Sequence, residues 1–582
     1  MEPKPIIYQM LPRLFSNANR ACVPGGTIMQ NGCGKLNDIT PKVLRAIRGL
    51  GATHVWYTGV IEHAHCSDYT RYGIRRDNPH IVKGQAGSPY AIKDYYDIDP
   101  DLAVDVPARM AEFEALVERT HAEGMKVIID FVPNHVARQY ESDVKPEGVK
   151  DLGDGDDHTL FFGRDNNFYY IPRQQFAPSV NLGEGADEYV EFPAKASGND
   201  CFTAFPGEYD WYETAKLNYG VDYGDWSRHF DPIPDTWHKM LDILKFWASK
   251  GIDGFRCDMA HMVPVEFWRW AIAQVKKASA GVVFIAEIYE VGLYRPYIDA
   301  GFDYLYDKVN LYDTLRAVET GHVSAAAITS CWQTVGDIMP HMLNFLENHD
   351  EQRFASAQYA GDPQRVWPSL AVSSMMGTGP MMIYAGQELG EPAADAEGYS
   401  GADGRTTIFD YWSVDTLRRW LNGGDPGNDL LSPQEAMLRR RYAQMLNLCN
   451  SEAAIAEGKF FDLMYANYEN PGVNPHRQFA FMRGVEGNVV LAVCNFDRHP
   501  ADVKVNVPRH AFEFFGINEG KAKAYDLITG TEREIDFAPE IPVELQIGPS
   551  DAAIVRISPA KSAKACDTMP SATAIKAENK DN

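Results

Sequence analysis

The stretch Gly251-Ile-Asp-Gly-Phe-Arg-Cys-Asp258 joins a helix end to a short apolar strand and closes on two charged residues. The glycine at its start tolerates the left-handed backbone that ends many helices. Arg256 and Asp258 stand two residues apart, so a strand presents both on one face. Burying two charges together is costly unless they bind each other or take part in chemistry. An isolated Arg-x-Asp would indicate a structural ion pair, so its interpretation depends on the other strand ends.

The same order, a helix ended by glycine and followed at once by an apolar strand, recurs through the first two thirds of the chain. Gly51, Gly124, Gly281 and Gly301 each precede such a strand. With three further apolar segments, the pattern predicts eight strands, at residues 6–10, 54–60, 126–131, 254–258, 282–287, 302–306, 342–346 and 380–384. They are apolar throughout rather than alternating, which is typical of parallel strands covered by helices.

Eight β/α units predict an α/β fold, a closed (β/α)8 TIM barrel. A doubly wound open sheet is the alternative, but no Gly-rich phosphate-binding turn follows the first strand. About a hundred residues separate the third strand from the helix that begins near Asp235, and a segment of that length must fold as a domain of its own. From about Arg477 the hydrophobic period becomes two, as in Val503, Val505 and Val507, which predicts a C-terminal antiparallel β-sandwich domain.

These patterns predict four parts of the chain. The barrel takes residues 1–136 and 232–455, the inserted domain residues 137–231, and the C-terminal β domain residues 456–560. Residues 561–582 are rich in Ala, Ser, Lys and Asp and predict a disordered tail.

Composition excludes several classes of partner. The 582 residues are 45% hydrophobic and 23% charged, the profile of a globular protein. A net charge of −25 argues against nucleic acid or an anionic membrane, since both need clustered Lys and Arg. No apolar run is long enough to cross a bilayer. Nine scattered cysteines without a Cys-x-x-Cys indicate neither a zinc site nor a disulfide framework, and with no visible secretion signal they predict a cytoplasmic protein.

Carboxylates and histidines gather at four strand ends, where a (β/α)8 barrel places its functional residues. These ends have the sequences Asp130-Phe-Val-Pro-Asn-His135, Gly254-Phe-Arg-Cys-Asp258, Phe284-Ile-Ala-Glu287 and Phe345-Leu-Glu-Asn-His-Asp350. A purely structural role would require every charged side chain there to be a satisfied ion pair at the same end of the barrel. We therefore interpret the set as a catalytic site.

These four segments, in this order, resemble the α-amylase family of retaining glycoside hydrolases (glycoside hydrolase family 13) over roughly residues 5–450. The resemblance implies that Asp258 is the nucleophile, Glu287 the general acid/base and Asp350 the carboxylate that stabilises the transition state. It also implies that Arg256 keeps the nucleophile ionised. The chemistry agrees, because retaining cleavage needs two close carboxyl groups in opposite protonation states, and a guanidinium lowers the pKa of a neighbouring carboxyl. The apolar Phe-Ile-Ala before Glu287 should favour its protonated form.

The same resemblance implies three further contacts with the sugar. His135 and His349 match the family histidines that hold sugar hydroxyls. Tyr90, in Gly87-Ser-Pro-Tyr90, matches the tyrosine that stacks under the sugar at the cleavage subsite; the alternative is an ordinary loop aromatic.

Calcium is an open question in the sequence. Asn134 matches the asparagine that ligates a structural calcium ion in many members of the family, and an amide oxygen suits that ion. Partner ligands are not evident, and Lys216, in Lys216-Leu-Asn218, stands where the family motif has an aspartate. A hydrogen bond from Asn134 to the inserted domain is the alternative. No organic cofactor is implied.

The resemblance implies cleavage of α-1,4-glucosidic bonds in starch, glycogen or maltodextrins by double displacement. A 4-α-glucanotransferase or another transglycosylase would use the same covalent intermediate and pass the sugar to a sugar hydroxyl. A non-catalytic carbohydrate-binding protein would be signalled by loss of Asp258 or Glu287, and both are present. The expected partner is an oligo- or polysaccharide. Many members follow the nucleophile with Lys-His, whereas this chain has Asp258-Met-Ala-His261, so the preference between long and short glucans stays open.

Overall fold

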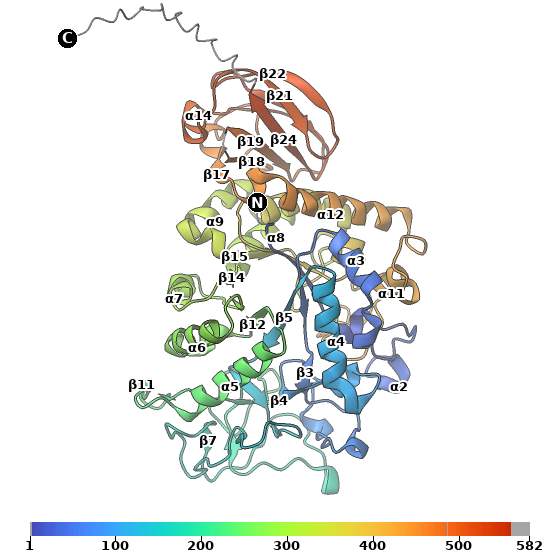
Figure 1. Cartoon of the computed structure of the whole chain (residues 1–582), viewed down its shortest axis with the longest axis vertical. Coiled ribbons are helices and arrows are strands. Elements are labelled where there is room, and N and C mark those ends of the chain that lie inside the picture. The colour runs from blue at the N-terminus through green and yellow to red at the C-terminus, as the bar shows by residue number, and fades with distance from the viewer. Residues whose placement is uncertain (1–2, 486, 560–582) are drawn as a thin grey trace, which may run out of the picture.

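Eight parallel strands close into a barrel in the computed structural model, which describes residues 3–485 and 487–559 (Figure 1). The strands follow chain order around the barrel, and the last pairs back to the first. They are β1 (Ile6–Met10), β2 (His54–Tyr57), β5 (Lys126–Phe131), β12 (Gly254–Cys257), β13 (Val283–Ala286), β14 (Tyr304–Tyr306), β15 (Met342–Phe345) and β16 (Met381–Tyr384). The prediction of a closed (β/α)8 barrel is confirmed, and the open sheet is excluded.

Helices follow the strands and cover the outside of the barrel (Figure 1). Their bounds are α3 (Pro41–Gly49), α4 (Arg109–Ala122), α5 (Asp235–Ser249), α6 (Val265–Ala278), α7 (Tyr294–Asp299), α8 (Asp313–Glu319), α9 (Ile328–Val335) and α10 (Trp367–Met375). The Thr40 side chain caps α3 by accepting a hydrogen bond from the N–H of Val43. The chain turns away from α5 at Gly251, whose φ is 85°. Helix α5 buries Trp237 against Phe267 of α6 and Trp247 against Phe113 of α4. The turn at the glycine and the burial of the apolar face of the helix together explain why the chain returns to the barrel after each helix.

Two excursions interrupt the repeat near the carboxyl ends of the strands. The first follows β2 and pairs β3 (Ile61–His63) with β4 (Ile92–Ile98). The second lies between β5 and α5 and contains β6 (His135–Ala137), β7 (Tyr170–Ile171), β8 (Ala194–Lys195), β9 (Thr214–Lys216), β10 (Val221–Asp222) and β11 (Ser227–Arg228). A small hydrophobic cluster around Phe176 and Tyr189 packs this segment against Ile81, which lies between β3 and β4. The boundary predicted after residue 136 falls within β6, which pairs with β9 and ties the inserted segment to the barrel.

The C-terminal part is a separate layer of antiparallel strands at the end of the molecule opposite the inserted segment (Figure 1). Helix α12 (Pro433–Ser451), which opens with a Ser432 capping box, leads into it. One sheet has the order β17 (Lys459–Asp462), β18 (Gln478–Val485), β19 (Asn488–Asn495), β24 (Asp551–Pro559), β21 (Gly520–Asp526) and β22 (Glu532–Phe537), and a second pairs β20 (Ala501–Val505) with β23 (Val543–Ile547). Val503 and Val505 are buried while Lys504 is exposed, which confirms the period-two pattern.

The predicted disordered tail, residues 561–582, lies outside the described residues. Within the described part of the chain, none of the helices has the length and apolar character that spanning a membrane requires.

Candidate active site

The carboxyl ends of the barrel strands open into a cavity of about 710 Å³. Its wall includes Tyr90, His135, Asp258, Glu287 and Asp350, the predicted site residues that face open space. The inserted segment and the loop after β16 supply the facing wall, which includes Trp211, Glu213, Tyr399 and Phe409. A second hollow, of about 570 Å³, lies in the C-terminal domain and contains none of the predicted site residues. The strand-end set therefore belongs to one cavity.

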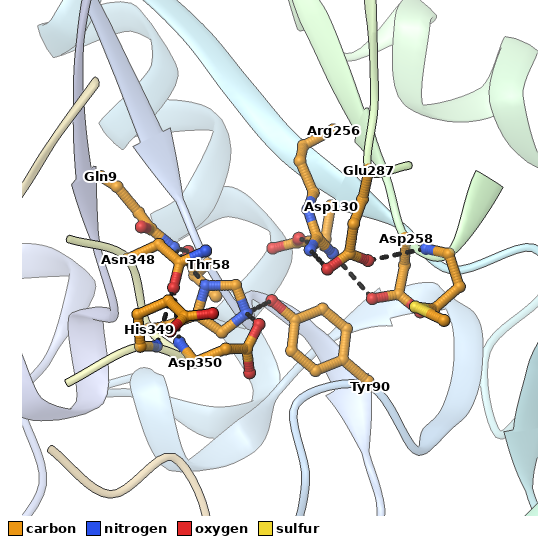
Figure 2. Close-up of polar contacts among 12 residues, drawn as sticks. Gln9, Thr58, Tyr90, Asp130, Arg256, Asp258, Glu287, Asn348, His349 and Asp350 are labelled. Atoms are coloured by element: carbon orange, nitrogen blue, oxygen red, sulfur yellow. Dashed lines mark hydrogen bonds and ion pairs between the residues drawn. The ribbon is translucent and has the colours of Figure 1, made fainter. Parts of the chain in front are cut away.

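A single buried guanidinium holds the two central carboxylates (Figure 2). Nη1 of Arg256 lies 2.7 Å from Oδ1 of Asp258, and Nη2 lies 2.7 Å from Oε1 of Glu287. Strand β12 pairs with β13 in a register that sets Cys257 opposite Ala286, so the next residue of each strand emerges at the same level. Asp258 and Glu287 therefore stand side by side, as chemistry that uses two close carboxyl groups requires.

Two further donors orient the Glu287 carboxylate. The Tyr289 hydroxyl donates to Oε1 at 2.5 Å, and the backbone N–H of Met259 donates to Oε2 at 2.7 Å. The ring of His261 packs edge-on against Tyr289, with centroids 5.9 Å apart. Sequence reasoning missed Tyr289, although its spacing of two residues from Glu287 was a usable signal.

The pKa of Asp258 is shifted in the direction opposite to the sequence-based expectation. Burial, followed by the charge of Glu287, raises the pKa of Asp258 well above its usual range, although the contact with Arg256 acts in the opposite direction. Arg256 does lower the pKa of this carboxyl, as predicted, but burial and the charge of Glu287 outweigh it. The same guanidinium is also shared with Glu287 and with Asp130, whose Oδ1 lies 3.5 Å from Nη1. Asp258 therefore holds a proton more tightly in the free protein than an exposed aspartate does.

Asp350 has the opposite electrostatic character. Its side chain is 35% exposed, and its Oδ2 lies 3.0 Å from Nε2 of His349. Tyr399 donates its hydroxyl to Oδ1 at 3.1 Å. Burial opposes a charge on Asp350, but the contacts with His349, the charge of Arg256 and the hydrogen bond from Tyr399 together outweigh it and lower the pKa of Asp350 to about 2. Asp350 is therefore a permanent anion facing the cavity.

Tyr90 lies between the Asp350 side and the Asp258 side of the site (Figure 2). Its hydroxyl is 2.5 Å from Nε2 of His349, and the two rings stack with centroids 5.3 Å apart. The amide of Gln9 contacts Nδ1 of the same imidazole at 2.7 Å, which fixes the orientation of the ring. Tyr90 is only 9% exposed and presents that small surface to the cavity. The arrangement can place one face of a sugar ring against an aromatic surface.

His135 lines the cavity from the first strand of the inserted segment. Its ring lies 5.2 Å from that of Trp211, which sequence reasoning did not identify. Burial, followed by the charges of Lys216 and Lys83, lowers the pKa of His135 to about 3. A neutral imidazole at this position can donate a hydrogen bond to a sugar hydroxyl or accept one from it.

Asn134, the predicted calcium ligand, already has a cationic partner. Its Oδ1 accepts a hydrogen bond from the ammonium group of Lys216, and its Nδ2 donates to the carbonyl of Gly198 at 2.7 Å. An oxygen occupied by an ammonium group cannot also ligate a divalent cation at the same point. The residues present therefore do not fit calcium at Asn134.

A buried acidic cluster lies outside the cavity, on β3 and β4. Glu62, Asp94 and Asp97 bring carboxylate oxygens within 4.8 Å of one another. Asp97 is paired with Arg109, whereas Glu62 accepts no hydrogen bond from any described residue, and the ammonium of Lys93 stays 3.5 Å from its Oε1. Burial, only partly offset by Lys93, raises the pKa of Glu62 well above its usual range. Glu62 thus keeps its proton in the fold to a higher pH than an exposed glutamate does.

Glu62→Gln is expected to make the stability of the fold less dependent on pH. The unfolded chain loses the Glu62 proton near pH 4.3, whereas the folded chain keeps it to higher pH. The folded state then binds more protons, so stability falls as pH rises above that value, by about 1.4 kcal/mol per pH unit for one group. Gln removes this contribution. The slope of Tm against pH, measured from pH 5 to 8, tests this expectation, and the exposed substitution Glu118→Gln is the control. A slope in Glu62→Gln equal to that of wild type would contradict the expectation.

The comparisons with known proteins agree with this geometry. The family model "Alpha amylase, catalytic domain" matches residues 9–176 and 231–421, more than half of the chain. The alpha-amylase MalA of Haloarcula japonica is 28% identical over 348 residues, which cover 59% of this chain and 39% of that protein. Neopullulanase 2 of Thermoactinomyces vulgaris is 22% identical over 409 residues, with 67% and 57% covered. The chain thus spans about half the length of the curated relatives it matches.

Solved structures agree on the fold. A maltogenic alpha-amylase from Thermotoga neapolitana superposes with a TM-score of 0.61 at 17% identity, over 95% of this chain and 99% of that one. An alpha-amylase from Geobacillus thermoleovorans, complexed with acarbose, gives the same TM-score and identity over 95% and 98%. With the family match over both parts of the barrel, the chain belongs to the α-amylase family.

Proposed function

We propose that the protein is a retaining glycosidase that cleaves α-1,4-glucosidic bonds of starch, glycogen or maltodextrins. One observation carries the proposal: Arg256 holds Asp258 and Glu287 together in a cavity that also receives the anionic Asp350. Two adjacent carboxyl groups are the pair that retaining cleavage uses.

In the first step the Asp258 carboxylate attacks the anomeric carbon, and the glycosidic bond breaks with its electron pair going to the leaving oxygen. Glu287 donates its proton to that oxygen, so the departing sugar leaves as a neutral alcohol. The product is a glycosyl ester on Asp258. This step requires Glu287 to be protonated and Asp258 to be ionised when the substrate is bound. Arg256 contacts both carboxylates and accommodates the shift of charge between them.

In the second step the Glu287 carboxylate takes a proton from water, and the hydroxide oxygen attacks the anomeric carbon. The ester bond breaks, and Asp258 leaves as a carboxylate. Two inversions retain the α configuration. Both transition states carry positive charge on the sugar ring, and Asp350, whose low pKa keeps it ionised, stabilises that charge.

The aromatic side chains of the cavity suit a chain of sugar rings. Tyr90, Trp211 and Tyr399 contribute apolar faces, while the carboxylates and His135 supply polar groups at defined places. The relatives' names include an alpha-amylase, a neopullulanase and a cyclomaltodextrin glucanotransferase, which supports an α-glucan as the substrate class. Because one of these relatives is a glucanotransferase, transglycosylation through the same intermediate remains the alternative.

The product profile from maltoheptaose tests the proposal, with Asp258→Asn as the control. Hydrolysis gives only glucose and shorter maltodextrins, and proton NMR of the early products shows the α anomer. Chains longer than the input would assign the protein to the transglycosylases. Unchanged maltoheptaose with retained binding would contradict catalysis on this substrate and favour a carbohydrate-binding protein.

A further inference from the structure

Lys216 is a buried cation at the junction of the inserted segment and the barrel. The residue is only 2% exposed, and the pairing of β9 with β6 sets it opposite His135. Its ammonium donates to the amide Oδ1 of Asn134, and it lies 2.6 Å from Oδ1 of Asp200. A third contact, at 3.3 Å, reaches the backbone carbonyl of Met262. Three oxygens from three distant parts of the chain therefore converge on one nitrogen.

The three partners are the kinds of oxygen that a calcium ion takes. An amide oxygen, a carboxylate oxygen and a peptide carbonyl are typical hard ligands. The ammonium group of Lys216 donates hydrogen bonds to the amide and the carbonyl oxygen and forms an ion pair with the carboxylate. A divalent cation at the same point would touch the ammonium and be repelled by it. The pocket thus holds one cation, and that cation is covalently part of the chain.

We propose that the ammonium group of Lys216 is a permanent substitute for a calcium ion at this junction, which makes assembly of the site independent of calcium. The group links Asn134, at the end of β5, to Asp200 in the inserted segment and to Met262, four residues after Asp258. A bound ion would make the same links but could be removed by a chelator. The inference rests on these contacts and does not require the proposed activity.

The position also connects Lys216 to the cavity. Asn134, which accepts from Lys216, contacts Nδ1 of His135 through its Nδ2 at 3.1 Å. The charge of Lys216 contributes, after burial, to the low pKa of His135. Lys216 is therefore a positioning residue. Its ammonium group holds Asn134, and Asn134 in turn contacts His135, which lines the cavity.

Two substitutions at residue 216 separate a cation site from a simple packing role. Lys216→Asp shortens the side chain and adds a carboxylate beside Asp200, which leaves room and ligands for an ion. Lys216→Met keeps the length without charge or ligand. In EGTA we expect both variants to melt several degrees below wild type, because each leaves Asp200 without its buried partner. Millimolar Ca²⁺ is expected to raise the Tm of Lys216→Asp alone, in a saturable way, and to leave wild type within about 1 °C of its value in EGTA.

Two results would overturn the proposal. One is a folded Lys216→Asp chain whose response to Ca²⁺ does not exceed that of Lys216→Met, since the three oxygens would then not form a cation site. The other is a wild-type protein that Ca²⁺ stabilises and that loses this response on Asn134→Ala, since Asn134 would then bind an ion despite Lys216. The wild-type measurement decides the question even if Lys216→Asp does not fold. An unchanged wild-type Tm supports the proposal.

Discussion

Asp258→Asn is expected to lower kcat on maltoheptaose by roughly 10⁴-fold or more, the scale of loss when an enzyme's nucleophile is removed. An uncharged amide of the same shape attacks the anomeric carbon poorly and leaves no carboxylate to form the ester. The substitution keeps the volume of the side chain, and Arg256 retains Glu287 as an ionic partner, so the fold is expected to persist. Initial rates and far-UV circular dichroism measure the two effects. A rate near that of wild type would refute the assignment of Asp258.

Asp258→Gly offers a chemical control for the same assignment. The shorter side chain leaves space between Arg256 and the substrate that a small anion can fill. Azide added to this variant is expected to attack the anomeric carbon of an activated α-glucosyl substrate and give the β-glucosyl azide. That single displacement inverts the configuration, whereas the wild-type enzyme retains it. Exposed Asp225→Gly, treated identically, should neither lose activity nor respond to azide. Failure of azide to restore turnover, with the fold intact, would count against Asp258 as the nucleophile.

Glu287→Gln is expected to lower kcat on maltoheptaose by about 10²- to 10⁴-fold, the usual contribution of a general acid or base. Gln cannot donate a proton to the leaving oxygen or accept one from water. The amide keeps the size of the carboxylate, but its single oxygen can accept from only one of the two donors that now contact separate oxygens of Glu287, the Tyr289 hydroxyl and the N–H of Met259. The effect differs from that of Asp258→Asn because the covalent step itself remains possible.

The leaving group separates the two roles of Glu287. α-Glucosyl fluoride needs little protonation to depart, so the first step is expected to survive in Glu287→Gln while the second, which needs a base, stays slow. The glycosyl ester on Asp258 should then accumulate and appear as a covalent mass increase in the intact protein. Asp258→Asn treated in the same way serves as the control and should show no adduct. Equal losses on maltoheptaose and on the fluoride, without any adduct, would contradict the role of Glu287 as acid and base.

The eight barrel strands were predictable because each rests on a local signal. A helix-ending glycine followed by a short apolar run marks a β/α junction wherever it occurs, and the strands of the barrel pair in chain order. Strand ends then fall at the same level, as Cys257 and Ala286 do, so residues adjacent to the strands meet in space. That is why Arg256, Asp258 and Glu287 could be placed together before their contacts were known.

Other parts of the site depend on contacts between distant segments. Trp211 reaches His135 from the far end of the inserted segment, and Tyr399 reaches Asp350 from the loop after β16. Neither has a spacing that predicts its partner, because irregular loops have no period. The pKa of Asp258 could not be predicted from its neighbour Arg256 alone, since it also depends on burial and on Glu287.

The sequence by itself determined the barrel, the C-terminal antiparallel layer and the cluster of charged residues at the strand ends. Each follows from periodicity and from the conformational preferences of glycine, which act over a few residues. Only the tertiary structure decided that one guanidinium serves three carboxylates, Asp130, Asp258 and Glu287. It also decided that contact with His349 lowers the pKa of Asp350, and that Lys216 donates to the oxygen of Asn134. Electrostatic interactions and burial depend on distances through space, and a linear chain does not specify those distances until it folds.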